Sequence, residues 1–94
     1  MIEWAEPAIQ QLNQSYDYIV LTNSEAVATR VLEHILNRVQ RLATFPLSGR
    51  RGRVLDTREL VIADTPFIVA YTIEQDRVLV LAVYRAARQW PETF

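Results

Sequence analysis

Apolar residues recur at helical spacing twice in the first half of the chain. The first series predicts an amphipathic helix over residues 7–21, and the second predicts a longer helix over residues 24–44. Because Thr22 and Asn23 leave only a short loop between them, the two helices should form an antiparallel hairpin. The residues expected to face the core are Ile9, Leu12, Tyr16, Ile19 and Val20 in the first helix, and Ala28, Val31, Leu32, Ile35, Val39 and Leu42 in the second.

From residue 57 onward the pattern changes to that of β-strands. Strands are predicted over residues 57–62, 67–73 and 77–84, and residues 1–4 form a short first strand. The short connections between the last three strands predict an antiparallel meander. The unbroken apolar run over residues 78–84 predicts a central last strand that is covered on both faces. The order β-α-α-β-β-β therefore predicts an α+β fold, with an antiparallel helical hairpin packed on a small antiparallel β-sheet.

The composition narrows the chemistry that the chain can perform. Ninety-four residues suffice for one domain, over residues 1–94, and half of them are apolar. The chain has no cysteine and one histidine, His34, on the polar face of the second helix, where it is expected to be solvated. This composition excludes thiolate and histidine-rich metal sites, and no catalytic triad or glycine-rich phosphate loop is present, so we expect no metal and no cofactor. The first residues lack the features of a signal peptide and no apolar run could cross a bilayer, so a cytoplasmic protein is expected.

Positive charge is concentrated in the middle of the chain. Residues 35–60 hold six arginines against Asp56 and Glu59, and all ten basic residues of the chain are arginine. A GC-rich genome could account for this preference, but the arginine fork also suits phosphate and carboxylate partners. Both glycines, Gly49 and Gly52, flank an arginine pair in a loop, where glycine provides either a positive φ or a close approach.

The arginines of this loop and the end of the last strand form the candidate binding surface. Arginine binds anions well but is a poor proton shuttle, so we expect binding to an anionic or acidic partner rather than catalysis. The residues at the chain end are expected to form a rim near the arginine loop, although Trp90 could instead cover the edge of the core while Arg88 pairs with Glu92. The alternative for the whole set is that these arginines are scattered over the surface and share no function. The candidate target-binding residues are Arg50, Arg51, Arg53, Arg58, Arg85, Arg88 and Trp90.

Three motifs in this order resemble those of a known family. They are LATFPLSGRRGR, DTRELVI and DRVLVLAVYRAARQWP. Together they resemble the RelE/ParE superfamily of bacterial type II toxins, specifically its ParE-like branch, from Trp4 to Pro91. The resemblance implies a toxin that a cognate antitoxin neutralises by laying a helix and an extended segment over it. It also implies one of two targets, because ParE toxins poison DNA gyrase whereas RelE toxins cut mRNA on the ribosome.

The residues that RelE nucleases use are mostly replaced in this chain. An ungapped comparison puts Glu59 and Val61 where the nucleases have strand lysines, and Ile68 where they have an arginine. The tail arginine is kept as Arg88, and the tail tyrosine becomes Phe94. Losing these groups should remove most of the electrostatic stabilisation that phosphodiester cleavage needs. The comparison therefore favours a gyrase-directed toxin. We also expect no membrane association and no sequence-specific nucleic-acid binding. A ribosome-dependent mRNA endonuclease and an inactive relic that only binds an antitoxin are the alternatives.

Overall fold

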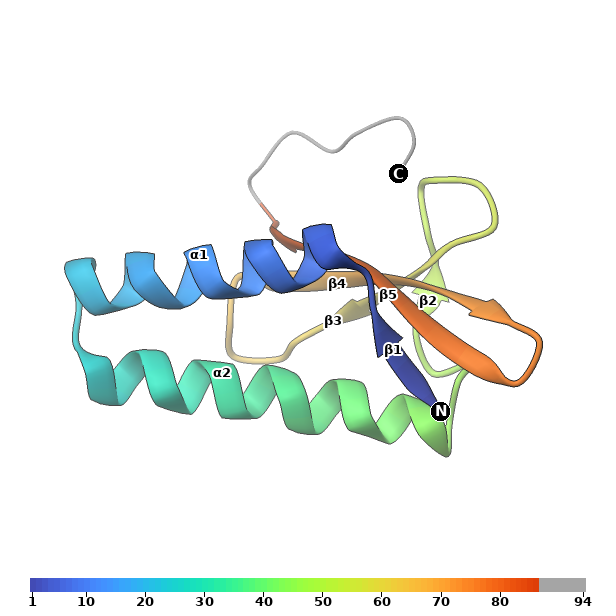
Figure 1. Cartoon of the computed structure of the whole chain (residues 1–94), viewed down its shortest axis with the longest axis horizontal. Coiled ribbons are helices and arrows are strands. Elements are labelled where there is room, and N and C mark those ends of the chain that lie inside the picture. Colours follow the sequence, from blue (N-terminus) through green and yellow to red (C-terminus); the bar gives the residue numbers. More distant parts are fainter. Residues whose placement is uncertain (87–94) are drawn as a thin grey trace.

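Two antiparallel helices pack against one face of a five-stranded sheet (Figure 1). The computed structural model describes residues 1–86. The α+β class and the helical hairpin are confirmed. None of the helices within the described residues is both long enough and apolar enough to span a membrane. In chain order the elements are β1 (Ile2–Trp4), α1 (Glu6–Thr22), α2 (Glu25–Gln40), the 3-10 helix η1 (Arg41–Ala43), β2 (Arg50–Arg51), β3 (Arg58–Val61), β4 (Phe67–Glu74) and β5 (Arg77–Arg85).

Local signals explain where the helices begin and end. Pro7 lies in the first turn of α1, where its missing N–H breaks no helical hydrogen bond. The Oγ of Ser24 caps α2 by accepting a hydrogen bond from the amide of Val27 at 3.1 Å. The α-helical part of α2 ends at Gln40, and one 3-10 turn continues it. The predicted end at residue 44 therefore included this tighter turn.

The sheet is mixed, so the prediction of a purely antiparallel sheet was wrong. Its strand order is β1-β5-β4-β3-β2, and β1 pairs with β5 in parallel, with Ile2 opposite Val78 and Trp4 opposite Val80. The whole helical hairpin and the meander separate these two strands in sequence. Because hydrophobic alternation carries no information about strand direction, the pattern could not reveal the parallel pairing.

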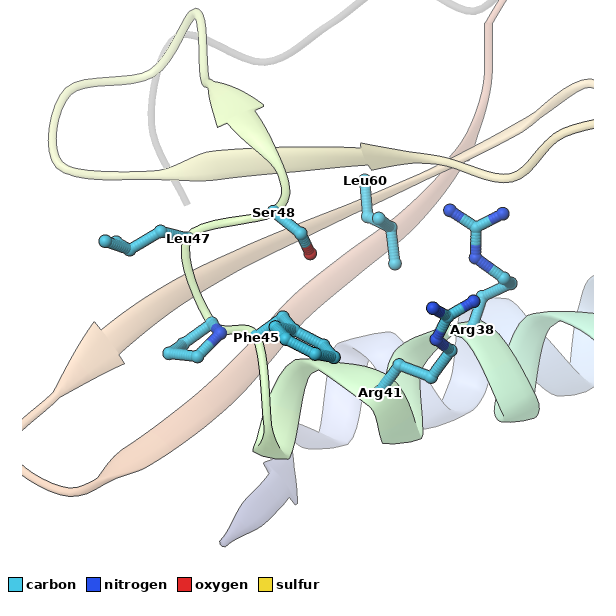
Figure 2. Close-up of a pocket in the computed structure, with 7 residues that line it drawn as sticks. Arg38, Arg41, Phe45, Leu47, Ser48 and Leu60 are labelled. Carbon is cyan, nitrogen blue, oxygen red and sulfur yellow. The ribbon is translucent and has the colours of Figure 1, made fainter.

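A fifth strand, β2, was also missed. It has two residues, too few for any alternation to be visible, and it pairs with only the first half of β3. Beyond this pairing, Leu60 lines an open groove between β3 and the end of α2 (Figure 2). The region predicted as a plain arginine loop is therefore partly an edge strand.

The last strand, β5, is interior in the sheet but is not buried on both faces. Val78 and Val80 are buried, whereas Leu79 and Leu81 are only partly buried. The prediction of cover on both faces was wrong because the helices cover one face only. The pairing shifts by one residue near Ala70, so the alternation along β5 is broken there.

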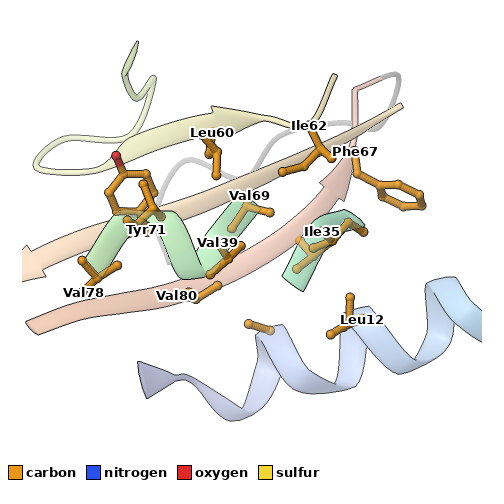
Figure 3. Close-up of a cluster of buried hydrophobic side chains, with 13 residues drawn as sticks. Leu12, Ile35, Val39, Leu60, Ile62, Phe67, Val69, Tyr71, Val78 and Val80 are labelled. Atoms are coloured by element: carbon orange, nitrogen blue, oxygen red, sulfur yellow. The ribbon is translucent and has the colours of Figure 1, made fainter. Parts of the chain in front are cut away.

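The core lies between the hairpin and the covered face of the sheet (Figure 3). In α1 the core positions are Ala8 and Leu12, while Ile9, which was predicted to be buried, is exposed. The predicted core position lies one residue too late, which corresponds to a rotation of about 100° around the helix. The true position, Ala8, has a small side chain and therefore gave little hydrophobic signal. The buried members of the cluster are Ala8, Leu12, Ile35, Val39, Leu42, Leu60, Ile62, Phe67, Val69, Tyr71, Val78, Val80 and Val83.

Candidate functional site

A buried tyrosine anchors the segment that leads from the helices into the arginine loop. The Oη of Tyr71 donates to the carbonyl of Pro46 at 2.7 Å and accepts from the amide of Gly49 at 2.9 Å. Burial raises the pKa of Tyr71 above its ordinary value, so the hydroxyl keeps the proton that it donates. A Cβ on Gly49 would lie 2.5 Å from this oxygen, so close approach explains why glycine occupies the position. Tyr71 is fully buried and is a structural residue of the loop.

The second glycine closes the loop itself. The amide of Gly52 donates to the carbonyl of Thr57 at 2.8 Å, and a Cβ at Gly52 would lie 2.3 Å from the Thr57 Oγ1. Neither glycine has a positive φ; the residue with that conformation in the loop is Asp56, with φ of 62°. Both glycines thus serve the close approach of backbone to side chain, which was one of the two expected reasons.

A buried carboxylate holds two of the loop arginines. The Glu59 side chain is 2% exposed and accepts hydrogen bonds from Nε and Nη2 of Arg50 at 3.3 and 3.0 Å. Its other oxygen accepts from the backbone amide and the Nε of Arg53 at 2.9 and 3.2 Å. Burial alone would raise the pKa of Glu59, but these donors hold it below its ordinary value. Glu59 is therefore an ionised anchor beneath two arginines that remain about half exposed.

The sequence comparison missed this function of Glu59. It treated the residue only as the replacement of a nuclease lysine. A carboxylate at the start of a strand, six and nine residues after two arginines of a glycine-containing loop, was the available signal. Only the antiparallel register, which sets Glu59 opposite Arg50, shows that the three residues meet.

The other two loop arginines lie directly opposite each other. Arg51 of β2 faces Arg58 of β3, a pairing of like charges that disfavours the fold. The Nη1 of Arg58 donates to the carbonyl of Gly49 at 2.8 Å, so this guanidinium is held by the backbone. The side chain of Arg51 is exposed and makes no hydrogen bond or ion pair within residues 1–86. A groove of about 680 Å³ lies beside them, lined by Arg51, Gly52, Arg53, Leu55, Asp56, Thr57, Arg58, Thr72 and Ile73.

Arg85, the one member of the expected rim that the described residues include, lies apart from the arginine loop. Its guanidinium carbon is 4.5 Å from the centre of the Tyr18 ring on α1, a cation–π contact. The register places Arg85 opposite Phe67 and Glu59 opposite Ala70, on the two sides of β4 and three residues apart along it. This odd spacing also directs the two side chains to opposite faces of the sheet. The remaining candidates, Arg88 and Trp90, lie outside the described residues.

His34 is less solvated than expected. Its Nε2 lies 2.9 Å from the carbonyl of Ala63, in the turn between β3 and β4. The ring therefore connects α2 to the edge of the sheet. Within residues 1–86 no group of three or more histidine or carboxylate side chains could hold a metal ion.

Known proteins with similar sequences or structures point to one family. The family model described as the ParE toxin of the type II toxin–antitoxin system, parDE, matches residues 2–90. Y4kP of Sinorhizobium fredii (strain NBRC 101917 / NGR234), named as a candidate toxin, is 43% identical over 91 residues, covering 97% of this chain and 93% of the relative. A solved chain from a chromosomal ParDE toxin–antitoxin system of P. aeruginosa superposes with a TM-score of 0.82 at 22% identity, covering 89% of this chain and 92% of that one. At this identity the structural likeness shows a common fold.

Proposed function

Because the chain belongs to the ParE toxin family of type II toxin–antitoxin systems, we propose that it inhibits DNA gyrase by binding it and that an antitoxin neutralises it. The inhibition is non-enzymatic in this proposal. The chain blocks or traps the target through its arginine surface, without breaking a bond of its own.

The observation that carries this proposal is the environment of Glu59. The comparison with RelE nucleases puts a strand lysine at this position, where a cation would stabilise phosphodiester cleavage. Here a buried carboxylate accepts four hydrogen bonds from Arg50 and Arg53. The single negative charge of Glu59 thus offsets part of the positive charge of these two arginines, which weakens the electrostatic stabilisation of a phosphoryl transition state. Binding therefore explains the arrangement better than mRNA cleavage does.

The arginine loop is the proposed target-binding surface. Arg50, Arg53 and Arg58 are held in place by hydrogen bonds, so less side-chain entropy is lost when a partner binds. Arg51 opposite Arg58 costs stability in the free protein, and an anionic partner between them would offset that repulsion. The chemistry of the loop suits a carboxylate-rich surface of the target. Arg85 belongs to a separate part of the proposed surface, and Arg88 and Trp90 stay predicted target-binding residues outside the described part of the chain.

A supercoiling assay tests the proposal directly. The purified chain is added to gyrase and relaxed plasmid, and in parallel to ribosomes programmed with mRNA. We expect loss of supercoiling or trapping of the cleavage complex, while ribosome-bound mRNA stays intact. Adding the cognate antitoxin should restore supercoiling.

A pair of matched variants assigns the activity to the loop. Arg51→Glu reverses an exposed charge of the loop, and Arg30→Glu reverses an exposed charge on α2. We expect Arg51→Glu to reduce inhibition at least ~30-fold, as for a hot-spot arginine, and Arg30→Glu to retain it. Codon-positioned cuts in mRNA with unaffected gyrase would overturn the proposal in favour of the nuclease. A folded protein without effect in either assay would indicate the relic.

A further inference from the structure

The tip of the arginine loop, residues 54–57, is fixed by hydrogen bonds of its own. The Oγ1 and the amide of Thr57 both donate to the carbonyl of Val54, at 2.6 and 3.2 Å. From β4, the Oγ1 of Thr72 donates to the carbonyl of Asp56 at 2.9 Å, and the positive φ of Asp56 reverses the chain direction there. The conformation of the tip is therefore set in the free protein.

This fixed tip holds one leucine out in solvent. Val54 and Thr57 are buried, whereas Leu55 is 87% exposed, the largest exposed fraction among the large apolar side chains of residues 1–86. A single exposed leucine is common on protein surfaces, so its exposure alone indicates nothing. What distinguishes Leu55 is that the backbone on both sides of it is held in place and that a groove lies beside it.

Leu55 lines the same groove of about 680 Å³ as the loop arginines Arg51, Arg53 and Arg58. Ile73 of β4 adds a second exposed apolar side chain, so the groove combines apolar and cationic walls. Exposed apolar area bordered by charge is typical of a protein-binding surface.

The walls of this groove favour a protein partner over nucleic acid, and gyrase with its bound DNA offers both. Nucleic acid binds mainly through its phosphates, which need many basic contacts. Among the lining residues, the charge of Arg53 is partly offset by Glu59, and the carboxylate of Asp56 would repel phosphate. Leu55 has no aromatic face on which a base could stack.

We propose that this groove docks on the protein of the target rather than on its DNA, with Leu55 as the apolar anchor, an inference that rests on the gyrase inhibition of the proposed function. Leu55 inserts between apolar side chains of the target, while carboxylates beside them pair with Arg51 and Arg58. Because the tip is already ordered, little conformational entropy is lost on insertion. Leu55 thereby restricts the loop to acidic surfaces that also contain an apolar pocket.

The test replaces Leu55 with arginine, because the two partners then predict changes of opposite sign. On a protein surface the anchor is lost and a charge meets apolar side chains, so binding to gyrase and inhibition of supercoiling should fall at least ~30-fold. On DNA an added cation would strengthen binding and steepen its salt dependence. Leu55→Ala removes only the apolar contact and should weaken inhibition about tenfold. Binding to DNA-free gyrase and binding to plasmid without gyrase are measured separately.

Leu21 provides the matched control. It is 86% exposed at the end of α1, and the turn between the two helices lies at the opposite end of the molecule from the arginine loop (Figure 1). Leu21→Arg adds the same charge at an equally exposed leucine, so its inhibition should stay within about threefold of that of the wild type. Since both leucines are largely exposed, thermal unfolding of all three variants should resemble that of the wild type.

The outcomes separate this inference from the proposed function. If Leu55→Arg binds and inhibits gyrase as the wild type does, the anchor is refuted and the proposed function stands. Stronger inhibition together with tighter binding to plasmid would also overturn the inference, because the groove would then serve DNA. A wild type that leaves gyrase unaffected would refute the proposed function, and this inference with it. Losses in both Leu55 variants, with plasmid binding unchanged and Leu21→Arg active, would confirm Leu55 as the anchor.

Discussion

The arginines of the β2–β3 loop and those of the α2 groove differ in what their guanidinium groups contact. Arg50 and Arg53 share the buried carboxylate of Glu59. Arg38 and Arg41 have no such partner within residues 1–86, although the groove leaves them open to one. The first pair therefore contributes to the fold and presents the remaining N–H groups in a fixed geometry. The second pair contributes little to the fold.

This difference separates two ways of presenting positive charge. An arginine whose side chain is already hydrogen-bonded loses less conformational entropy when a partner binds, but its removal also lowers the stability of the protein. A free arginine is ordered only on binding, and its removal leaves the protein intact. Substitutions at Arg38 and Arg41 are consequently clean tests of binding, whereas those at Arg50 and Arg53 need a parallel measurement of stability.

The largest effect is expected for Glu59→Gln. The amide cannot compensate two guanidinium groups and cannot accept all four hydrogen bonds. Removing one partner of a fully buried pair costs about 3–5 kcal/mol, but Arg50 and Arg53 can be hydrated, so we expect about 2 kcal/mol. Urea unfolding at pH 7 measures the loss. The control is Glu74→Gln, which breaks an exposed pair with Arg77 and should destabilise the protein far less, because solvent screens this pair. Equal losses for both variants would mean that Glu59 does not anchor the loop.

The next effect is expected for Tyr71→Phe, which removes the hydroxyl that holds the start of the loop. The carbonyl of Pro46 and the amide of Gly49 would lose their partner, at a cost of about 1–2 kcal/mol. Because the pKa of Tyr71 is raised, the contribution of the hydroxyl is present below the ordinary value of 10.0 and is lost as the pH rises through the folded pKa. Hydrogen exchange at Gly49 should accelerate in the variant. Unchanged exchange would show that the loop is held from elsewhere.

A smaller effect is expected from acid, since the pKa of Glu59 is lowered in the folded state. Its contribution to stability is present above the ordinary value of 4.5 and is lost as the pH falls through the folded pKa. The difference in unfolding free energy between the wild type and Glu59→Gln should therefore narrow as the pH decreases from 5 towards acid. Urea titrations at a series of pH values measure it. A difference that stays constant over this range would place the titrating group elsewhere.

The smallest effect is expected for the combined Arg38→Gln and Arg41→Gln variant. Since neither side chain has a partner within residues 1–86, the change in stability should stay within about 0.5 kcal/mol. Thermal unfolding of the free protein checks it. A loss comparable to that of Glu59→Gln would erase the distinction between the arginines that Glu59 binds and those without a side-chain partner in the described part of the chain.

The sequence revealed which residues belong to the candidate site better than it revealed how those residues are arranged. The glycine-flanked arginines stood out in the sequence, and Arg50, Arg51, Arg53 and Arg58 do lie together around one loop. The carboxylate that holds two of them was not foreseen, because a buried ion pair depends on strand register rather than on spacing along the chain. Arg85 was expected near this loop, but the register sets it opposite Phe67, at the other end of β4 from the loop, where it contacts Tyr18.

By itself, the sequence determined the helical hairpin, the meander and the family resemblance. Helical periodicity, capping residues and turn residues act over a few positions, so they are readable without a structure. Only the tertiary structure decided the parallel pairing of β1 with β5, the edge strand β2, the burial of Glu59 and the groove beside α2. These features depend on which segments meet across tens of residues. Such contacts arise because one face of the sheet must be covered, and many sequences of the same local pattern could cover it differently.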